Sequence, residues 1–204
     1  MTTTGPADRA HFERLYRQQD DPYGLRHRWY EARKRAVLLA SLPRRRYRRA
    51  YEPGCGAAEL SAELAPRCDR LLASDFSDAA VALARRRLQG QPHVQVQRHT
   101  LPQDWPQDAA PFDLIVLSEI GYFIEEAAWR EVADACGRSL AADGDLAACD
   151  WQPDFAQRRQ SSDAVQAALG GLGLRLIARH EEQDFLLQVW SRDPRSVAQR
   201  EGLR

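Results

Sequence analysis

From residue 48 onward, short apolar runs alternate with helical stretches, and this alternation most constrains the fold. Strands that alternate with helices form a parallel sheet covered by helices on both faces. Phe112–Ser118 is the most apolar run, as expected of a central strand buried on both sides. We expect strands at 48–52, 69–75, 93–98, 112–118 and 146–149. We expect helices at 57–65, 78–88 and 125–140, and a turn at Asp143-Gly144.

The chain closes on two further strands, 174–180 and 185–190, which follow a helix at 162–172. The short acidic turn between these strands leaves no room for a crossover helix, so they must pair antiparallel. The predicted fold class is therefore α/β: a seven-stranded sheet, mostly parallel with an antiparallel last strand, and helices on both faces.

Two helices precede the alternating region, at Ala7–Gln19 and Trp29–Leu42. A length of 204 residues fits one domain. We divide it into an N-terminal helical cap (1–43), a core (44–192) and a polar tail (193–204). The second helix is predicted to carry one side made of Trp29, Arg33, Ala36, Val37 and Ala40.

The charges balance, with 29 basic and 29 acidic residues, and Lys34 is the only lysine. A zero net charge argues against general binding to nucleic acid or to an anionic membrane. The run Arg44–Arg49 could bind phosphates, but a solvated loop is the favoured interpretation. No stretch reaches the roughly 20 apolar residues of a membrane span, and the N-terminus lacks an apolar signal core.

The four cysteines are far apart and form no CxxC pair, which predicts reduced thiols in a cytoplasmic protein. The histidines show no paired spacing, so we expect no metal site.

A glycine-containing loop, Glu52-Pro53-Gly54-Cys55-Gly56, follows the first predicted strand. Ligands bind at this edge of an open α/β sheet. Glu59 replaces the third glycine of a dinucleotide loop and would be a poor neighbour for pyrophosphate. S-adenosyl-L-methionine lacks phosphate and is cationic at its sulfonium and ammonium groups, so it fits this acidic loop better.

Asp75 ends the second predicted strand, 19 residues after Gly56 (75 − 56). An acid at roughly this distance from a glycine loop binds ribose hydroxyls. The alternative is that Asp75 only caps the next helix. Ser77 and Asp78 already supply caps there, so the ribose interpretation is favoured.

The segments E-P-G-C-G-A-A-E-L, L-L-A-S-D-F-S and F-D-L-I-V-L-S-E resemble motifs I, II and IV of class I S-adenosylmethionine-dependent methyltransferases, which have a Rossmann-like fold. Segments 29–35, 101–106 and 117–123 resemble the nodulation protein S family, whose members N-methylate the deacetylated glucosamine end of a chitooligosaccharide. The resemblance extends over residues 21–192.

The resemblance implies roles for individual residues. It places Glu52, Gly54 and Gly56 around the methionine part of the cofactor, with Pro53 and Cys55 in the same loop. Asp75 and Ser77 would lie at the ribose and Phe76 at the adenine. The adenine edge would contact His99, Thr100 and Leu101. Trp29, Tyr30 and Arg33 would close over the cofactor, with Arg33 pairing with its carboxylate.

The predicted methyl-transfer residues follow the fourth and fifth strands. Ser118 and Glu119 would lie next to the methyl group, where the Glu119 carboxylate could take a proton from an ammonium or hold it. Tyr122 could hydrogen-bond the substrate. Asp150 and Trp151 are expected to face the same crevice and offer a second acid and a stacking ring. An acidic rim of Glu119, Glu125, Glu126 and Asp150 favours a cationic substrate and thus N-methylation.

The favoured hypothesis is an N-methyltransferase acting on an amine of a small molecule, with an amino sugar or oligosaccharide as the candidate. Where the family often has His-Trp-Arg, this chain has Asp150-Trp151-Gln152, so other acceptors stay open. The alternatives are O- or S-methylation and a cofactor-binding protein without turnover. An NAD-dependent oxidoreductase is disfavoured by Glu59. We expect a monomer or a homodimer.

Overall fold

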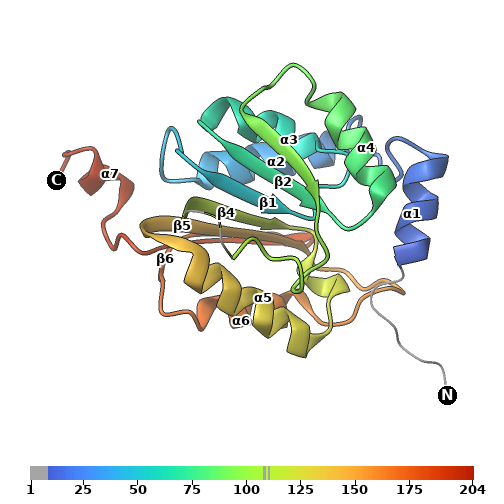
Figure 1. Cartoon of the computed structure of the whole chain (residues 1–204). Helices are drawn as coiled ribbons and strands as arrows, with labels where there is room; N and C mark the ends of the chain where they lie inside the picture. The colour runs from blue at the N-terminus through green and yellow to red at the C-terminus, as the bar shows by residue number, and fades with distance from the viewer. Residues whose placement is uncertain (1–8, 108, 110) are drawn as a thin grey trace.

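The computed structural model describes residues 9–107, 109 and 111–204 of the chain (Figure 1). Its strands are β1 (Ala50–Pro53), β2 (Leu71–Asp75), β3 (Val94–Arg98), β4 (Phe112–Ser118), β5 (Leu140–Trp151), β6 (Arg175–Glu181) and β7 (Phe185–Ser191). They form one seven-stranded sheet in the order β3-β2-β1-β4-β5-β7-β6.

Strands β1 to β5 are parallel, and β7 runs antiparallel to both β5 and β6. Three residues, 182–184, join β6 to β7, which permits only an antiparallel pair. The predicted fold class is confirmed, including the antiparallel last strand.

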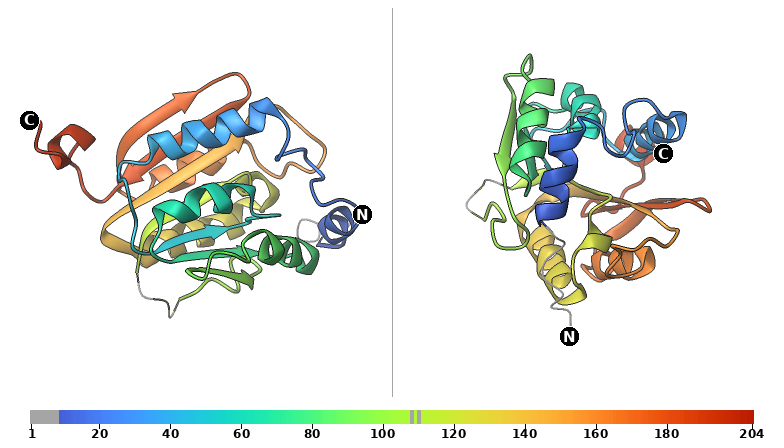
Figure 2. Two further views of the ribbon diagram at one scale, coloured as in Figure 1. Left: turned by 90° about the horizontal axis from the view of Figure 1, so that it is seen from above. Right: turned by 90° about the vertical axis from the view of Figure 1, so that its right-hand side faces the viewer.

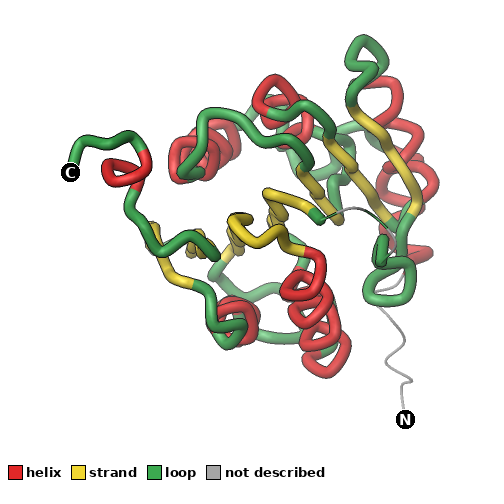
Figure 3. The backbone as a smooth tube through the Cα atoms, turned by 60° about the vertical axis from the view of Figure 1, so that its left-hand side comes forward, coloured by secondary structure: helices red, strands yellow, loops and turns green. Residues whose placement is uncertain are grey.

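Helices cover both faces of the sheet, as Figures 1 and 3 show. One face carries α2 (Trp29–Ser41), α3 (Glu59–Leu64) and α4 (Asp78–Arg87), and the other carries α5 (Glu126–Ser139) and α6 (Ser162–Gly170). Two more helices, α1 (Arg9–Gln18) and α7 (Val197–Arg200), lie at opposite ends of the molecule (Figure 2). Short 3₁₀ turns are formed by Ala65–Arg67 and Gly121–Phe123. The predicted start of the first helix, Ala7, lies outside the described residues.

Each face of the sheet has its own apolar core. On one side, α2 buries Leu38 against Phe185 and Leu187 of β7. On the other, the fully buried Trp129 of α5 packs on the sheet, and its indole Nε1 donates a hydrogen bond to Val165 O of α6 at 3.0 Å. Because both faces are sealed, ligand sites are confined to the strand ends.

Two local predictions are wrong. The Asp143-Gly144 turn does not exist, because β5 runs through it with a register shift against β4. Glycine is needed there because a Cβ at Gly144 would lie 2.7 Å from the Leu140 side chain. The predicted side of α2 is also wrong: Lys34 and Leu38 are buried, whereas Trp29 is 78% exposed.

The arginine run forms the loop between α2 and β1, and Arg45, Arg46 and Arg48 are exposed, as the solvated-loop interpretation expected. The sequence did not reveal the ion pairs that this loop forms. Arg44 pairs with the fully buried Asp145 of β5 at 3.0 Å. Arg46 pairs with Asp69, and Arg48 lies 3.4 Å from Asp113. These ion pairs tie the amino ends of the strands together. They leave the run engaged with protein carboxylates instead of free for nucleic acid.

The residues after β7 include α7, whose Arg200 reaches back to Asp145 at 3.5 Å. The division into cap, core and tail stays a prediction. Within the described part of the chain, no helix is both long enough and apolar enough to cross a membrane.

Candidate functional site

A tightly folded glycine loop follows the carboxyl end of β1 and leads into α3, beside the carboxyl end of β2. Gly54 and Gly56 have φ angles of +72° and +53°, in the left-handed region that favours glycine. A Cβ on Gly54 would lie 2.1 Å from Ile120 Cγ2, so a side chain would displace its neighbour. The Cys55 amide donates a hydrogen bond to Ser74 O at 2.9 Å, which fixes the loop against β2.

Asp75 connects this loop to the start of α4. Its carboxylate accepts hydrogen bonds from the Gly56 amide at 3.0 Å and from the Ser77 amide at 2.9 Å. Burial raises the pKa of Asp75 to about 6, although these bonds oppose the shift. The structure therefore brings together Gly56 and Asp75, the two residues whose spacing was singled out in the sequence. Ser77 also caps α4, because its hydroxyl accepts from the Ala80 amide.

The side chain of Glu52 is buried beside the same loop. Only 3% of the residue is exposed, and burial raises the pKa of its carboxyl to about 8. The neighbouring Ser61 hydroxyl opposes this rise in pKa, but Oε2 of Glu52 has no partner of hydrogen-bond geometry among the described residues. Buried polar atoms are normally paired, so this oxygen points to a missing donor.

Helix α1 covers the loop (Figure 2), a role that the sequence did not reveal. Glu13 of α1 accepts hydrogen bonds from the Ser77 hydroxyl at 2.7 Å and from the Ala79 amide at 3.2 Å. The Tyr16 hydroxyl lies 2.6 Å from the position of a Cβ on Gly56. Phe76, the residue expected at the adenine, contacts Phe12 of α1 with 5.4 Å between ring centroids.

The residues after β3 lie beside β1 and β2. His99 Nδ1 is 3.1 Å from the Tyr51 hydroxyl, and burial lowers the pKa of His99. The Thr100 amide donates to Asp104 at 2.8 Å, which shapes the turn containing Leu101. Contact of His99, Thr100 and Leu101 with an adenine stays a prediction.

Glu119 follows β4 and has the left-handed φ of +61°, which is uncommon for a residue other than glycine. Its Oε1 accepts from Lys34 Nζ at 2.9 Å, while Oε2 accepts from the Tyr122 hydroxyl and from the Trp151 amide at 3.3 Å. The side chain is still 26% exposed. A carboxylate anchored at both oxygens yet open to solvent can receive a proton or hold a cation.

Lys34 is the residue of this site that sequence reasoning missed. It comes from α2, is 5% exposed, and also lies 3.1 Å from Glu31. Two signals pointed to it: it is the only lysine, and Leu38 one turn later marks the same buried side. A lysine normally faces solvent, so hydropathy alone placed it on the wrong side.

The expectation that Asp150 and Trp151 face the same crevice is wrong, because adjacent residues of a strand point to opposite faces. The Trp151 ring meets Tyr30 of α2 edge-on, with centroids 5.7 Å apart. Asp150 is 1% exposed and accepts a hydrogen bond from Gln166 Nε2 of α6 at 2.6 Å. Burial, reinforced by the nearby Glu119, raises the pKa of Asp150 well above its ordinary value.

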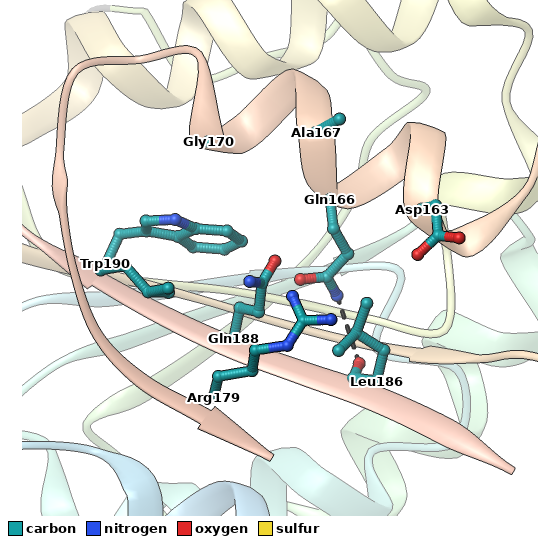
Figure 4. Close-up of a pocket in the computed structure, with 9 residues that line it drawn as sticks. Asp163, Gln166, Ala167, Gly170, Arg179, Leu186, Gln188 and Trp190 are labelled. Atoms are coloured by element: carbon teal, nitrogen blue, oxygen red, sulfur yellow. Dashed lines mark hydrogen bonds between the residues drawn. The ribbon is translucent and has the colours of Figure 1, made fainter. Parts of the chain in front are cut away.

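Gln166 also lines a separate hollow of about 340 Å³ between α6 and the β6–β7 hairpin (Figure 4). Its amide donates to Leu186 O at 3.2 Å and lies above Gln188 and Arg179. Asp150 is thus directed toward this side of the sheet, away from the ring of Trp151.

Other predicted contacts are engaged elsewhere. Arg33, expected to bind the cofactor carboxylate, forms a two-bond pair with Glu182 of the β6–β7 turn at 2.6 and 2.9 Å. The acidic rim is not built as predicted, because Glu125 and Glu126 are exposed and pair with Arg159 and Arg130. Of that rim, Glu119 alone combines fixed orientation with partial exposure.

Comparison with known proteins assigns the chain to a family. Residues 50–144 match the family model described as Methyltransferase domain. A crystal structure of a Pseudomonas syringae protein, described only as belonging to the methyltransferases, is 47% identical. It has a TM-score of 0.72, with 80% of this chain and 99% of that chain covered. The chain is an S-adenosylmethionine-dependent methyltransferase.

Two proteins similar to this methyltransferase are nodulation S proteins. The N-methyltransferase NodS from Bradyrhizobium japonicum WM9, solved with S-adenosyl-L-homocysteine, is 25% identical with a TM-score of 0.82. The alignment covers 92% of this chain and 98% of NodS. Nodulation protein S of Rhizobium tropici is 34% identical over 131 residues, or 62% of this chain and 53% of that protein. The matches span about half the length of the curated relatives.

The residues at the loop of this methyltransferase fit S-adenosylmethionine. The unpartnered Glu52 Oε2 can accept a hydrogen bond from an ammonium group, and the glycines allow close approach of backbone. Asp75 supplies the acid expected at ribose hydroxyls. When bound, the cofactor supplies a methyl group that its sulfonium activates. Among the described residues, no cluster of three or more His, Cys, Asp or Glu side chains could hold a metal ion.

Proposed function

We propose that this chain methylates an amine nitrogen of a small acceptor, with a terminal amino sugar as the preferred class. The observation that carries the proposal is the Glu119 carboxylate, fixed at both oxygens by Lys34 and Tyr122 and still 26% exposed. An amine near neutral pH is an ammonium ion, which must lose a proton before its lone pair can attack. A held carboxylate after the central strand suits that step.

The chain's own groups divide the work. Glu119 pairs with the incoming ammonium and takes one proton from it, leaving a neutral amine. The Tyr122 hydroxyl and the Trp151 amide hold Glu119 Oε2 in place while this happens. The rings of Tyr30 and Trp151 give the acceptor an aromatic wall on the α2 side. Positioning of this kind is the main contribution of a protein to an in-line displacement.

Two comparisons support nitrogen as the acceptor atom and a sugar as its carrier. One structural neighbour, of which 98% is covered, is described as an N-methyltransferase. The curated relatives are nodulation proteins S, whose family resemblance points to the free amine of a chitooligosaccharide. An oxygen or thiol acceptor would carry no ammonium for Glu119 to pair with.

The test is a panel of acceptors incubated with S-adenosylmethionine and read by mass spectrometry. Chitotetraose with one free terminal amine should gain 14 mass units, while its fully N-acetylated counterpart, which offers no amine, should gain none. Glucosamine tests whether one ring is enough. If only hydroxyl or thiol acceptors are methylated, the acceptor atom is oxygen or sulfur and the proposal of an amine acceptor is wrong. Cofactor binding without any product would overturn the proposal.

Glu119→Gln is the matched variant, since the amide keeps the shape of the side chain but cannot take the proton. We expect kcat to fall on the order of 100-fold, with affinity for S-adenosylhomocysteine retained. A variant with wild-type kcat would remove Glu119 from the mechanism.

A further inference from the structure

We infer that Lys34 is a positioning residue of the methyl-transfer site, which holds the Glu119 side chain aimed at the acceptor amine. The inference rests on the proposed function and deepens it. It assigns to the N-terminal helical cap a part of the catalytic apparatus, because Lys34 comes from α2 and Glu119 from the sheet.

The contacts of Lys34 are specific. Its Nζ lies 2.9 Å from Glu119 Oε1 and 3.1 Å from Glu31 Oε2, and 5.1 Å from the centre of the Tyr30 ring. The residue is 5% exposed. A buried ammonium is costly unless it is paired and hydrogen-bonded, and here both conditions are met.

The surrounding charges keep Lys34 cationic. Burial lowers the pKa of Lys34, but the carboxylates of Glu119 and Glu31 more than offset this, and its pKa lies above the ordinary value. A proton lost from Lys34 would leave two carboxylates facing each other without a counter-ion. Lys34 therefore serves as a fixed positive charge and does not carry protons itself.

The fixed charge matters because Glu119 has other acidic neighbours. The groups that interact with it are Lys34 and Tyr30 from α2, Tyr122 from the following turn, and Cys149 and Asp150 from β5. Of these, Lys34 alone is cationic. Without it, Oε1 would lose the charge that holds it, and the acidic neighbours would repel the carboxylate.

The contacts also fix the orientation of the Glu119 carboxylate. Lys34 holds Oε1, and the Tyr122 hydroxyl holds Oε2, so neither oxygen can swing away. Each carboxylate oxygen has two acceptor sites. Oε2 already accepts from the Tyr122 hydroxyl and the Trp151 amide, so Oε1 keeps one site for a further donor. The partly exposed carboxylate presents this site to an incoming ammonium.

Kinetics provide the first test, with glucosamine-terminated chitotetraose as the probe acceptor. Lys34→Met keeps the length of the side chain and removes its charge. We expect kcat to fall on the order of 100-fold, with S-adenosylhomocysteine affinity within about twofold, since the loop is untouched. Lys34→Arg should restore most of kcat. Glu63→Gln is the control, because Glu63 pairs with Arg35 of α2 and not with Lys34, and it should keep the wild-type kcat.

A spectroscopic readout works without turnover, because Lys34 is the only lysine. Protein labelled with ¹⁵N-lysine should give one side-chain ammonium signal. We expect Glu119→Gln to shift this signal and lower its titration midpoint. Glu63→Gln, which alters the pair with Arg35 at the other side of α2, should leave it unchanged.

The outcomes separate the two proposals. If the wild type methylates the amine and Lys34→Met turns over equally well, the positioning role is overturned while the proposed function stands. If the wild type methylates no amine, the proposed function fails and the positioning role falls with it. Should Lys34→Met not fold, Lys34→Arg and the lysine signal in Glu119→Gln decide. A signal that Glu119→Gln does not move overturns the inference.

Discussion

The affinity of the protein for S-adenosylhomocysteine should rise with pH, because Glu52 must ionise to bind an ammonium group. Burial raises the pKa of Glu52 to about 8, and its Oε2 has no partner among the described residues. With that pKa, about 3% of the carboxyl is ionised at pH 6.5 and about 76% at pH 8.5. The affinity should therefore increase about 25-fold over this range, or about 1.9 kcal/mol.

Stability of the free protein should change in the opposite direction. The folded pKa of Glu52 lies above its ordinary value of 4.5, so the folded state binds the proton more tightly than the unfolded state. The stabilisation from the protonated carboxyl is complete below pH 4.5 and is lost as pH rises through about 8. Bound S-adenosylhomocysteine should counteract this loss, since its ammonium stabilises the ionised form.

Isothermal titration calorimetry from about pH 6 to about pH 8.5 measures the affinity profile. Glu52→Gln should flatten its upper part, because the amide does not titrate. Glu63→Gln is the control. Glu63 is a partly exposed carboxyl on α3, the helix that follows the glycine loop, and its loss should leave the affinity profile unchanged. A flat wild-type profile, or a rise that survives in Glu52→Gln, would refute the assignment of Glu52 to the ammonium.

Three further predictions concern the frame around the site. Gly56→Ala should lower the free energy of unfolding, measured with urea, by at least about 1–2 kcal/mol because of the left-handed φ, and further because the new Cβ meets the Tyr16 hydroxyl. Adding Tyr16→Phe should recover this second loss, and no recovery would contradict the contact between α1 and the loop. Asp145→Asn leaves two arginines without their buried partner, so the unfolding free energy should fall by about 3 kcal/mol; altered S-adenosylhomocysteine affinity would contradict a purely structural role. The Ser77 hydroxyl holds the pKa of Glu13 at about 2, so its stabilisation is present above pH 4.5 and lost toward pH 2. Thermal melts should thus show a steeper acid loss in the wild type than in Glu13→Gln.

The parts of the fold that follow from local patterns could be predicted from the sequence. Alternating strands and helices fixed the parallel sheet, and the short turn after β6 required an antiparallel β7. Strand order then brings Asp75 beside the glycine loop, because β1 and β2 are neighbours with their carboxyl ends at one edge. The contact between Gly56 and Asp75 is a consequence of topology, so a spacing of 19 residues was informative.

Predictions failed where a residue's surroundings come from distant segments. Asp143-Gly144 has the composition of a turn, but it lies inside β5, at the register shift between Leu140 and Asp145 where β5 pairs with β4. The ion pairs of the arginine run could not be predicted because its partners, Asp69, Asp113 and Asp145, come from three other parts of the chain. The error at Asp150 and Trp151 is of another kind, because it was avoidable. The two-residue period of a strand already implied that the two side chains face opposite ways.

Glu119 shows why the position of a residue in the sequence is not yet a mechanism. Its place after the central strand follows from the sequence, but the orientation of its carboxylate does not. Three contacts fix that orientation, and one of them comes from Lys34 of α2. Leu38, one turn further along α2, is buried in the sheet's core, so the helix that supplies the charge is held in place by apolar packing. On the proposed role of Lys34, α2 belongs to the methyl-transfer site, and changes that loosen α2 should lower kcat before they lower cofactor affinity.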